Sequence, residues 1–127
     1  MSAEKIESYL ITLGVSFEEV EKNSWLINDT EKGIEQVVVI AADPLVVIRV
    51  NVMQVSKTRK EELFETLLRL NATDCIHSAY ALEGDEIILV DMMEHDIMTF
   101  EEFQSSLDSI GLTLAEHFQI LNKFRNT

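Results

Sequence analysis

Residues 34–55, IEQVVVIAADPLVVIRVNVMQV, decide the fold of this chain. Both halves of the stretch are rich in β-branched residues, which favour strands. Asp43-Pro44 divides them, and this dipeptide is typical of a turn. We therefore predict strands at 34–41 and 45–55, joined through residues 42–44 as a hairpin.

The second strand assigns its two faces clearly, whereas the first does not. In the second strand, one face would carry Val46, Ile48, Val50 and Val52, and the other Val47, Arg49, Asn51 and Met53. Because the second set includes an arginine and an asparagine, we expect the first set to face the core. In the first strand, residues 37–40 make both faces apolar. Such a strand is either enclosed within the protein or covered by another chain.

Shorter elements precede this hairpin. Apolar residues recur at steps of three and four over residues 3–13, which predicts a helix that ends at Gly14, with Ile11 off its apolar face. Extended segments are expected at 17–20 and 24–27, followed by a loop at 28–33.

A second helix is predicted to open at Thr58, where Thr58-x-x-Glu61 has the spacing of a capping box, and to stop near Asn71. Its apolar residues are Leu63, Phe64, Leu67, Leu68 and Leu70. They cover an arc of about 160°, wider than the ~100° that one-sided packing requires. The helix is either deeply seated in the core or packed on both its own sheet and a second subunit. We expect a homodimer, with Phe64 and Leu68 at the interface.

The last third of the chain predicts a hairpin and a long helix. Strands at 76–82 and 86–92 would be joined by a turn at 83–85. Thr99-x-x-Glu102 is a second capping-box sequence, and it opens a helical pattern of Phe103, Leu107, Ile110, Leu114, Phe118 and Leu121. The pattern stays in register past Gly111, which favours one helix, although Thr113-x-x-Glu116 could begin a separate one.

The predicted order is helix, three or four strands, helix, two strands, helix. Short hairpin connections indicate a mostly antiparallel sheet with the helices on one face, an α+β fold of order α-βββ-α-ββ-α. No repeat or linker divides the chain, so residues 1–127 are expected to form one domain.

Composition excludes several functional classes. The chain has 127 residues, 23 acids and 10 strong bases, for a formal charge of −13. This charge disfavours binding to nucleic acid, which requires neutralised phosphates, and to anionic membranes. No basic segment leads into an apolar run at the N-terminus, so we expect no secretory signal. The apolar run at residues 37–42 is too short to span a bilayer. We expect a cytoplasmic protein.

Motifs for catalysis and metal binding are missing from the sequence. It contains no phosphate-binding glycine loop, no nucleophile elbow and no cysteine pair with metal-ligand spacing. The single cysteine, Cys75, lacks a neighbouring basic residue and is expected to be a small buried hydrophobe. We therefore expect no catalytic residue, no metal and no cofactor.

The three histidines are far apart in sequence. His95 lies between Glu94 and Asp96, where adjacent side chains on an extended segment point in opposite directions, so a solvated acidic loop is favoured over a metal site. His77 is expected at the surface of a strand or half-buried there. His117 is expected at the boundary of the apolar face of the last helix.

Several stretches resemble a known group of proteins. These are Leu-Leu-Arg-Leu-Asn-Ala at 67–72, Tyr-Ala-Leu-Glu-Gly-Asp-Glu-Ile-Ile-Leu at 80–89, and Thr-Phe-Glu-Glu-Phe at 99–103. In this order they resemble the YbjN family and the wider group of type III secretion chaperones. The resemblance implies the α+β fold predicted above and a dimer. Secretion chaperones hold an unfolded stretch of a client on apolar surface patches, and YbjN proteins are described as regulators of sensory transduction.

Two functions follow as hypotheses. The first is a non-enzymatic protein-binding module that holds a partner polypeptide on an apolar sheet surface. We place this surface at Val37, Val39, Val47 and Met53, on the less protected face of the sheet, unless a loop or the dimer contact covers them. Trp25, the only tryptophan, either packs in the core or contributes its ring to this surface. The acidic surround favours basic partners. The second hypothesis is an acidic regulatory domain that binds a small ligand or a signalling partner.

Overall fold

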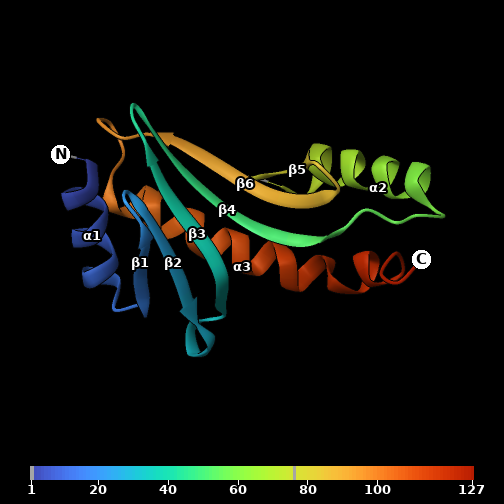
Figure 1. Cartoon of the computed structure of the whole chain (residues 1–127), viewed down its shortest axis with the longest axis horizontal. Helices are drawn as coiled ribbons and strands as arrows, with labels where there is room; N and C mark the ends of the chain where they lie inside the picture. Colours follow the sequence, from blue (N-terminus) through green and yellow to red (C-terminus); the bar gives the residue numbers. More distant parts are fainter. Residues whose placement is uncertain (1, 76) are drawn as a thin grey trace.

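A computed structural model describes residues 2–75 and 77–127. Its elements in chain order are α1 (Ser2–Leu13), β1 (Phe17–Glu21), β2 (Ser24–Asp29), the short 3-10 helix η1 (Thr30–Lys32), β3 (Ile34–Ala42), β4 (Leu45–Gln54), α2 (Lys60–Thr73), β5 (Ala79–Glu83), β6 (Glu86–Glu94) and α3 (Phe100–Asn122). All strands belong to one antiparallel sheet of order β1-β2-β3-β4-β6-β5 (Figure 1). The predicted α+β fold and element order are confirmed, with β1 as a short strand at one edge.

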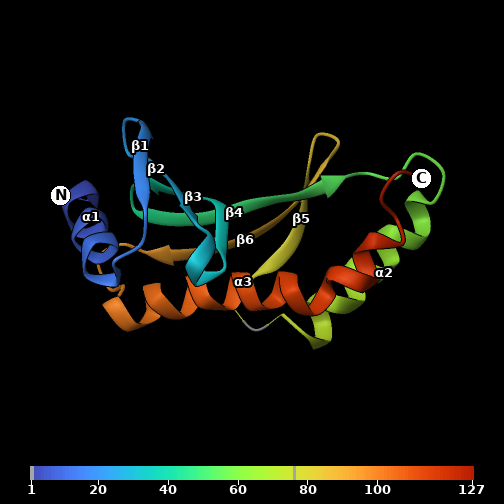
Figure 2. The same cartoon turned by 90° about the horizontal axis from the view of Figure 1, so that it is seen from below.

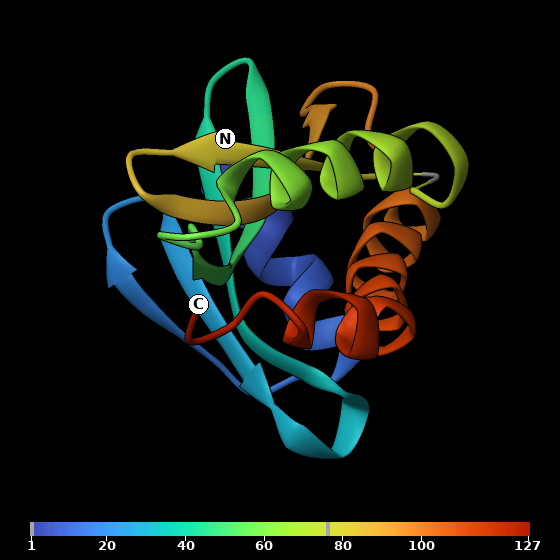
Figure 3. The same cartoon turned by 90° about the vertical axis from the view of Figure 1, so that its right-hand side faces the viewer.

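The helices lie on one face of the sheet and enclose a single apolar core. Figure 2 shows α3 running along this face, with α1 toward one end and α2 toward the other. Figure 3, viewed along the length of the molecule, shows α2 and the last turns of α3 closing one end. Trp25 of β2 is fully buried in the core, where its indole Nε1 donates a hydrogen bond to Glu7 Oε2 of α1 at 3.0 Å.

Strand β3 faces the core with the side chains of Val37 and Val39. Both are buried, because α1 and α3 pack against this side of the strand. Val38 and Ile40 occupy the opposite face and are half-buried. The sequence did not decide which face of this strand points to the core. In the structure Val37 and Val39, which we expected on the binding surface, face the core instead.

Strand β4 changes its facing near its end. Val46, Ile48 and Val50 are buried, as predicted. An irregularity in the pairing with β6 between Asn51 and Met53 then shifts the alternation by one residue. Met53 is consequently buried. The expectation that Met53 lies on the less protected face is wrong, because a β-bulge reverses the side on which the following side chains project.

Helix α2 begins one residue later than predicted. Its N-cap is Arg59, with no side-chain cap, so the expected capping box at Thr58 is wrong. The Ser56 hydroxyl instead accepts a hydrogen bond from the Arg59 backbone N–H at 2.9 Å. The helix also continues past Asn71 to Thr73.

Helix α3 is one continuous helix, as the register of its apolar residues predicted. The capping box is confirmed, since Thr99 Oγ1 accepts from the Glu102 N–H at 3.1 Å and Glu102 Oε1 accepts from the Thr99 N–H at 3.0 Å. The apolar face differs near its end. Phe118 is 55% exposed, whereas His117, expected at the boundary, is only 2% exposed.

Candidate binding surface

The face of the sheet opposite the helices carries a continuous group of apolar side chains. We call this group the open-face patch, and its members are Leu26, Val38, Ile40, Val47, Val90 and Met92. Met92 is exposed and the other five are half-buried. Helices α1, α2 and α3 lie on the other side of the sheet (Figure 2). The patch is therefore an apolar surface open to a partner.

Strand register arranges the patch in two rows across the sheet. Leu26 pairs with Val38, and Val38 pairs with Arg49, which in turn pairs with Val90. The second row runs from Ile40 to Val47 and on to Met92. Because paired side chains across antiparallel strands lie about 5 Å apart, each row forms a strip perpendicular to the strands. The second row is apolar throughout, whereas Arg49 interrupts the first between Val38 and Val90.

Arg49 is the one cation within the first row. It binds Glu83 of β5 through two parallel contacts, Nη1 to Oε2 at 2.7 Å and Nη2 to Oε1 at 2.8 Å. This bidentate geometry fixes the guanidinium plane. Hydrogen bonding from Arg49 holds the pKa of the Glu83 carboxyl below its ordinary value. The carboxylate therefore stays charged and keeps Arg49 folded over the sheet.

Most of the residues that the sequence predicted for this surface lie in the core instead. Val37, Val39 and Met53 are buried inside the chain, so their assignment to the less protected face is wrong. Trp25 is fully buried as well, which confirms core packing for this residue and excludes it from the surface. Only Val47 lies on the open face. The excess of apolar residues over what the core can hold was inferred correctly, but on β3 it resides in Val38 and Ile40.

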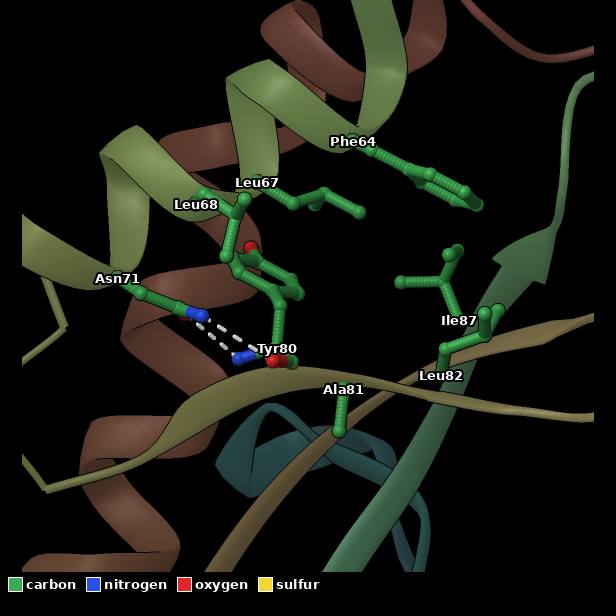
Figure 4. A pocket seen from close by; sticks show the side chains of 8 residues that line it. All are labelled: Phe64, Leu67, Leu68, Asn71, Tyr80, Ala81, Leu82 and Ile87. Atoms are coloured by element: carbon green, nitrogen blue, oxygen red, sulfur yellow. Dashed lines mark hydrogen bonds between the residues drawn. The ribbon is translucent and has the colours of Figure 1, made fainter. Parts of the chain in front are cut away.

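A second apolar surface lies between α2 and the edge strand β5. Figure 4 shows Phe64 and Leu68 projecting from α2 toward this groove, with Ala81, Leu82 and Ile87 on the strand side. Leu68 is 68% exposed, and Phe64 is half-buried. These are the two residues that the sequence assigned to a dimer interface, and the structure brings them together at one apolar groove.

Polar contacts close one end of this groove. Asn71 of α2 hydrogen-bonds the backbone of Tyr80 in β5 (Figure 4). The Tyr80 hydroxyl extends into the core and contacts His117 Nδ1 at 2.7 Å, while His117 Nε2 lies 3.3 Å from Asp74 Oδ2. The histidine thus links α3 to β5 and to the end of α2. Its role is structural, because these neighbours satisfy both ring nitrogens.

The remaining candidates for chemistry are not arranged as a catalytic or metal site. Burial, followed by the charge of Asp74, raises the pKa of the half-buried Cys75 thiol, which is the opposite of what a nucleophile needs. His77 is exposed, and His95 Nδ1 contacts Asp96 at 3.0 Å in a loop. Within residues 2–75 and 77–127, no three His, Cys, Asp or Glu side chains are grouped to hold a metal.

None of the helices over the described residues is long and apolar enough to cross a membrane.

Comparison with known sequences decides the family. The sequence model of CesT_Tir_1, a type III chaperone family, matches residues 1–127. The chain belongs to the CesT_Tir_1 family. The resemblance to YbjN and to type III secretion chaperones is thereby confirmed. Curated proteins, in contrast, give no significant match to it.

Solved structures show the CesT_Tir_1 fold at low sequence identity. A chain of the heterodimeric ExoU–SpcU complex from the type III secretion system of Pseudomonas aeruginosa superposes with a TM-score of 0.70 at 12% identity, covering 95% of this chain and 98% of that one. A protein from Methanothermobacter thermautotrophicus gives 0.68 at 17%, covering 98% and 99%. YbjN from E. coli gives 0.66 at 15%, covering 91% and 90%. At these identities the likeness establishes the fold alone.

Proposed function

We propose that this chain is a cytoplasmic, non-enzymatic protein-binding module that holds an extended segment of a partner polypeptide on the open-face patch. The observation that carries the proposal is the pair of apolar rows across β2, β3, β4 and β6, on the side of the sheet without helices. Burying such side chains contributes about 25 cal/mol per Å² of apolar surface. A partner that covers both rows therefore gains binding free energy from the burial of apolar surface.

The patch suits an extended peptide with alternating apolar side chains. In an extended chain every second side chain projects to the same side, so one peptide face can contact the rows while the other stays in water. The formal charge of −13 favours basic residues beside the apolar segment. Membership of a type III chaperone family supports the same kind of partner. So do the protein complexes among the structural neighbours, which include SycH with a fragment of YscM2, and ExsC with ExsE.

The test is site-specific photocrosslinking in the native host. A photoreactive residue at position 40 should crosslink to a defined polypeptide, and one at exposed Leu112 of α3 should not. The crosslinked partner is then identified by mass spectrometry, produced separately and titrated against the purified chain. Ile40→Asp/Val47→Asp should weaken its binding at least about tenfold, because each carboxylate would be desolvated in an apolar contact.

Matched variants separate binding from folding. Ile11→Asp/Leu112→Asp makes the same chemical change at exposed apolar positions away from the patch and should bind normally. Val39→Asp places a carboxylate in the core and should unfold the chain. Equal binding by the two double variants would refute the open-face site. A stoichiometric small molecule in native mass spectra, with no polypeptide partner, would instead favour the regulatory domain that binds a small ligand.

We also propose that the chain forms a homodimer through the groove between α2 and β5. The groove is almost wholly apolar, and Leu68 projects from it into solvent in the single chain. A second copy placing the same surfaces against it would bury both Leu68 and Phe64 in an isologous contact.

A further inference from the structure

The basic residues of this acidic chain are concentrated in two segments. Residues 52–60 and 118–127 contain five of the ten Lys and Arg residues and none of the 23 acids. These five are Lys57, Arg59, Lys60, Lys123 and Arg125. The rest of the chain is consequently even more acidic than its net charge suggests.

The fold joins the two segments, which lie about sixty residues apart in sequence. The Lys57 N–H donates to the Thr127 carbonyl oxygen at 3.1 Å, and Arg59 Nη1 donates to the Lys123 carbonyl oxygen at 3.1 Å. Arg125 Nη2 donates to the Val52 carbonyl oxygen at 3.3 Å. Figures 1 and 2 both show the start of α2 beside the end of the chain. We call the five bases in this arrangement the basic corner.

The basic corner borders a concave surface. Its polar lining includes Gln54, Lys57, Arg125 and Asn126, and Met53 and Phe124 add apolar surface. The site therefore combines cations, amide groups and apolar contacts, a combination that fits a flexible acidic peptide better than a bare inorganic ion.

The arginines are held in place, whereas the lysines are available. The Arg59 guanidinium lies 4.6 Å from the centre of the Phe124 ring and forms an ion pair with Glu62 at 2.8 Å. The Arg125 guanidinium lies 5.5 Å from the centre of the Phe118 ring. Lys57, Lys60 and Lys123 are exposed, and among the described residues their ammonium groups form no hydrogen bond or ion pair.

We propose that the basic corner binds an acidic segment of the protein partner. That the occupant belongs to a partner rests on the proposed function, whereas the charge complementarity stands independently of it. Nucleic acid is disfavoured because its phosphates would extend over the strongly acidic remainder of the molecule. A short acidic segment, in contrast, can confine its charge to the corner.

This arrangement produces a distinctive dependence on salt. At about 0.01 M salt the screening length is about 30 Å, so an acidic peptide is repelled by the whole molecule. At about 0.15 M it shrinks to about 8 Å, and a peptide in the corner interacts mainly with the nearby bases. At about 1 M even these contacts are screened. Binding should therefore be strongest at intermediate salt.

The experiment uses the full chain and a fluorescein-labelled deca-glutamate peptide, followed by fluorescence anisotropy over this range of salt. Binding at intermediate salt should weaken about fivefold in Lys57→Ala/Lys123→Ala, which removes two exposed cations. The control Lys22→Ala/Lys32→Ala makes the same change of net charge at exposed lysines outside the two segments and should bind like the unaltered chain. Far-UV circular dichroism should show that both variants are folded.

Other outcomes overturn the proposal. Equal weakening by the two double variants would show a general charge effect with no site at the corner. Binding that only strengthens as salt is lowered would contradict the local mechanism. Inorganic phosphate saturating the corner while deca-glutamate fails to bind would assign a small-anion site instead. Because the peptide is synthetic, each of these results is independent of whether the open-face patch holds a partner.

Discussion

The side chain of Asn71 forms two hydrogen bonds with the backbone of Tyr80. Asn71 Oδ1 accepts from the Tyr80 N–H at 2.7 Å, and Asn71 Nδ2 donates to the Tyr80 carbonyl oxygen at 3.1 Å. Strand β5 lies at the edge of the sheet, so these backbone groups have no neighbouring strand. The amide replaces that strand at one position. It therefore closes part of a free edge and ties α2 to the sheet at the end of the groove.

We expect Asn71→Asp to destabilise the chain. A carboxylate can accept from the Tyr80 N–H, but it cannot donate, and its second oxygen would face the Tyr80 carbonyl oxygen. The free energy of unfolding, measured by urea denaturation, should fall by about 1–3 kcal/mol. Asn28→Asp, which makes the same change at an exposed asparagine of β2, should have a much smaller effect. Equal losses in the two variants would mean that added negative charge alone is responsible.

Gly111 of α3 lies close to the backbone of Gly33, which restricts the residues that can replace it. A β-carbon at this position would lie 3.0 Å from the carbonyl oxygen of Gly33. In an unobstructed helix, Gly→Ala gains about 1 kcal/mol. Here the contact is with backbone, which yields less readily than a side chain, so we expect Gly111→Ala to lower the free energy of unfolding. Ser105→Ala, at an exposed position of the same helix, should be neutral or stabilising. A gain of the full propensity in Gly111→Ala would show that the η1 loop moves away freely.

The sequence predicted the elements well and the facing of β3 poorly. The regular apolar steps of α3 and the capping box at Thr99 were predicted from neighbouring residues alone. The same spacing at Thr58 failed, because Ser56 rather than Thr58 bonds the Arg59 backbone at the start of α2. The facing of β3 depends on pairing. The turn places Ala42 opposite Leu45, which sets Val38 opposite Arg49. A two-residue turn at Asp43-Pro44 pairs Val38 with Arg49, so the two side chains project to the same side of the sheet. A three-residue turn at 42–44 does not give this pairing.

Other features of the site had no signal in the sequence. The bulge that turns Met53 inward depends on how β4 pairs with β6. The alternation of apolar and polar residues in these two strands does not indicate it. The contact between Gly111 and Gly33 joins segments far apart in the chain, so the glycine could only be interpreted as a weak point in a helix. The burial of His117 likewise follows from the position of the Tyr80 hydroxyl. These are tertiary contacts that periodicity does not encode.

Tyr80 predicts a loss of stability at alkaline pH. Burial is the main reason that the pKa of its hydroxyl lies well above the ordinary range. In the unfolded chain the tyrosine ionises at about pH 10, whereas in the folded chain it remains neutral. Its contribution to stability is thus fully present below pH 10 and decreases as the pH rises above that value. The free energy of unfolding should decline there, and Tyr80→Phe should reduce this decline.

The same variant separates the two tyrosines spectroscopically. Tyr9 is less deeply buried than Tyr80, and burial with the charges of Glu101 and Glu102 raises its pKa as well. In a titration of tyrosinate absorbance, Tyr80→Phe should remove the later step, and Tyr9→Phe the earlier one. If Tyr80 ionised first, burial would not be the dominant influence on its pKa.

The proposed dimer makes a prediction with a closely matched control. Leu68 and Ile11 are equally exposed in the single chain, at 68% and 69%, but only Leu68 lines the groove between α2 and β5. Light scattering after size exclusion should give the unaltered chain and Ile11→Glu the mass of a dimer. Leu68→Glu should give the 14.5 kDa monomer, because a charge buried in the interface would lack a partner. Since the dimer stabilises its subunits by mass action, the melting temperature of the unaltered chain should rise with protein concentration, and that of Leu68→Glu should not. A 14.5 kDa mass for the unaltered chain at high micromolar concentration would refute the dimer, and a dimeric Leu68→Glu would place the interface on another surface.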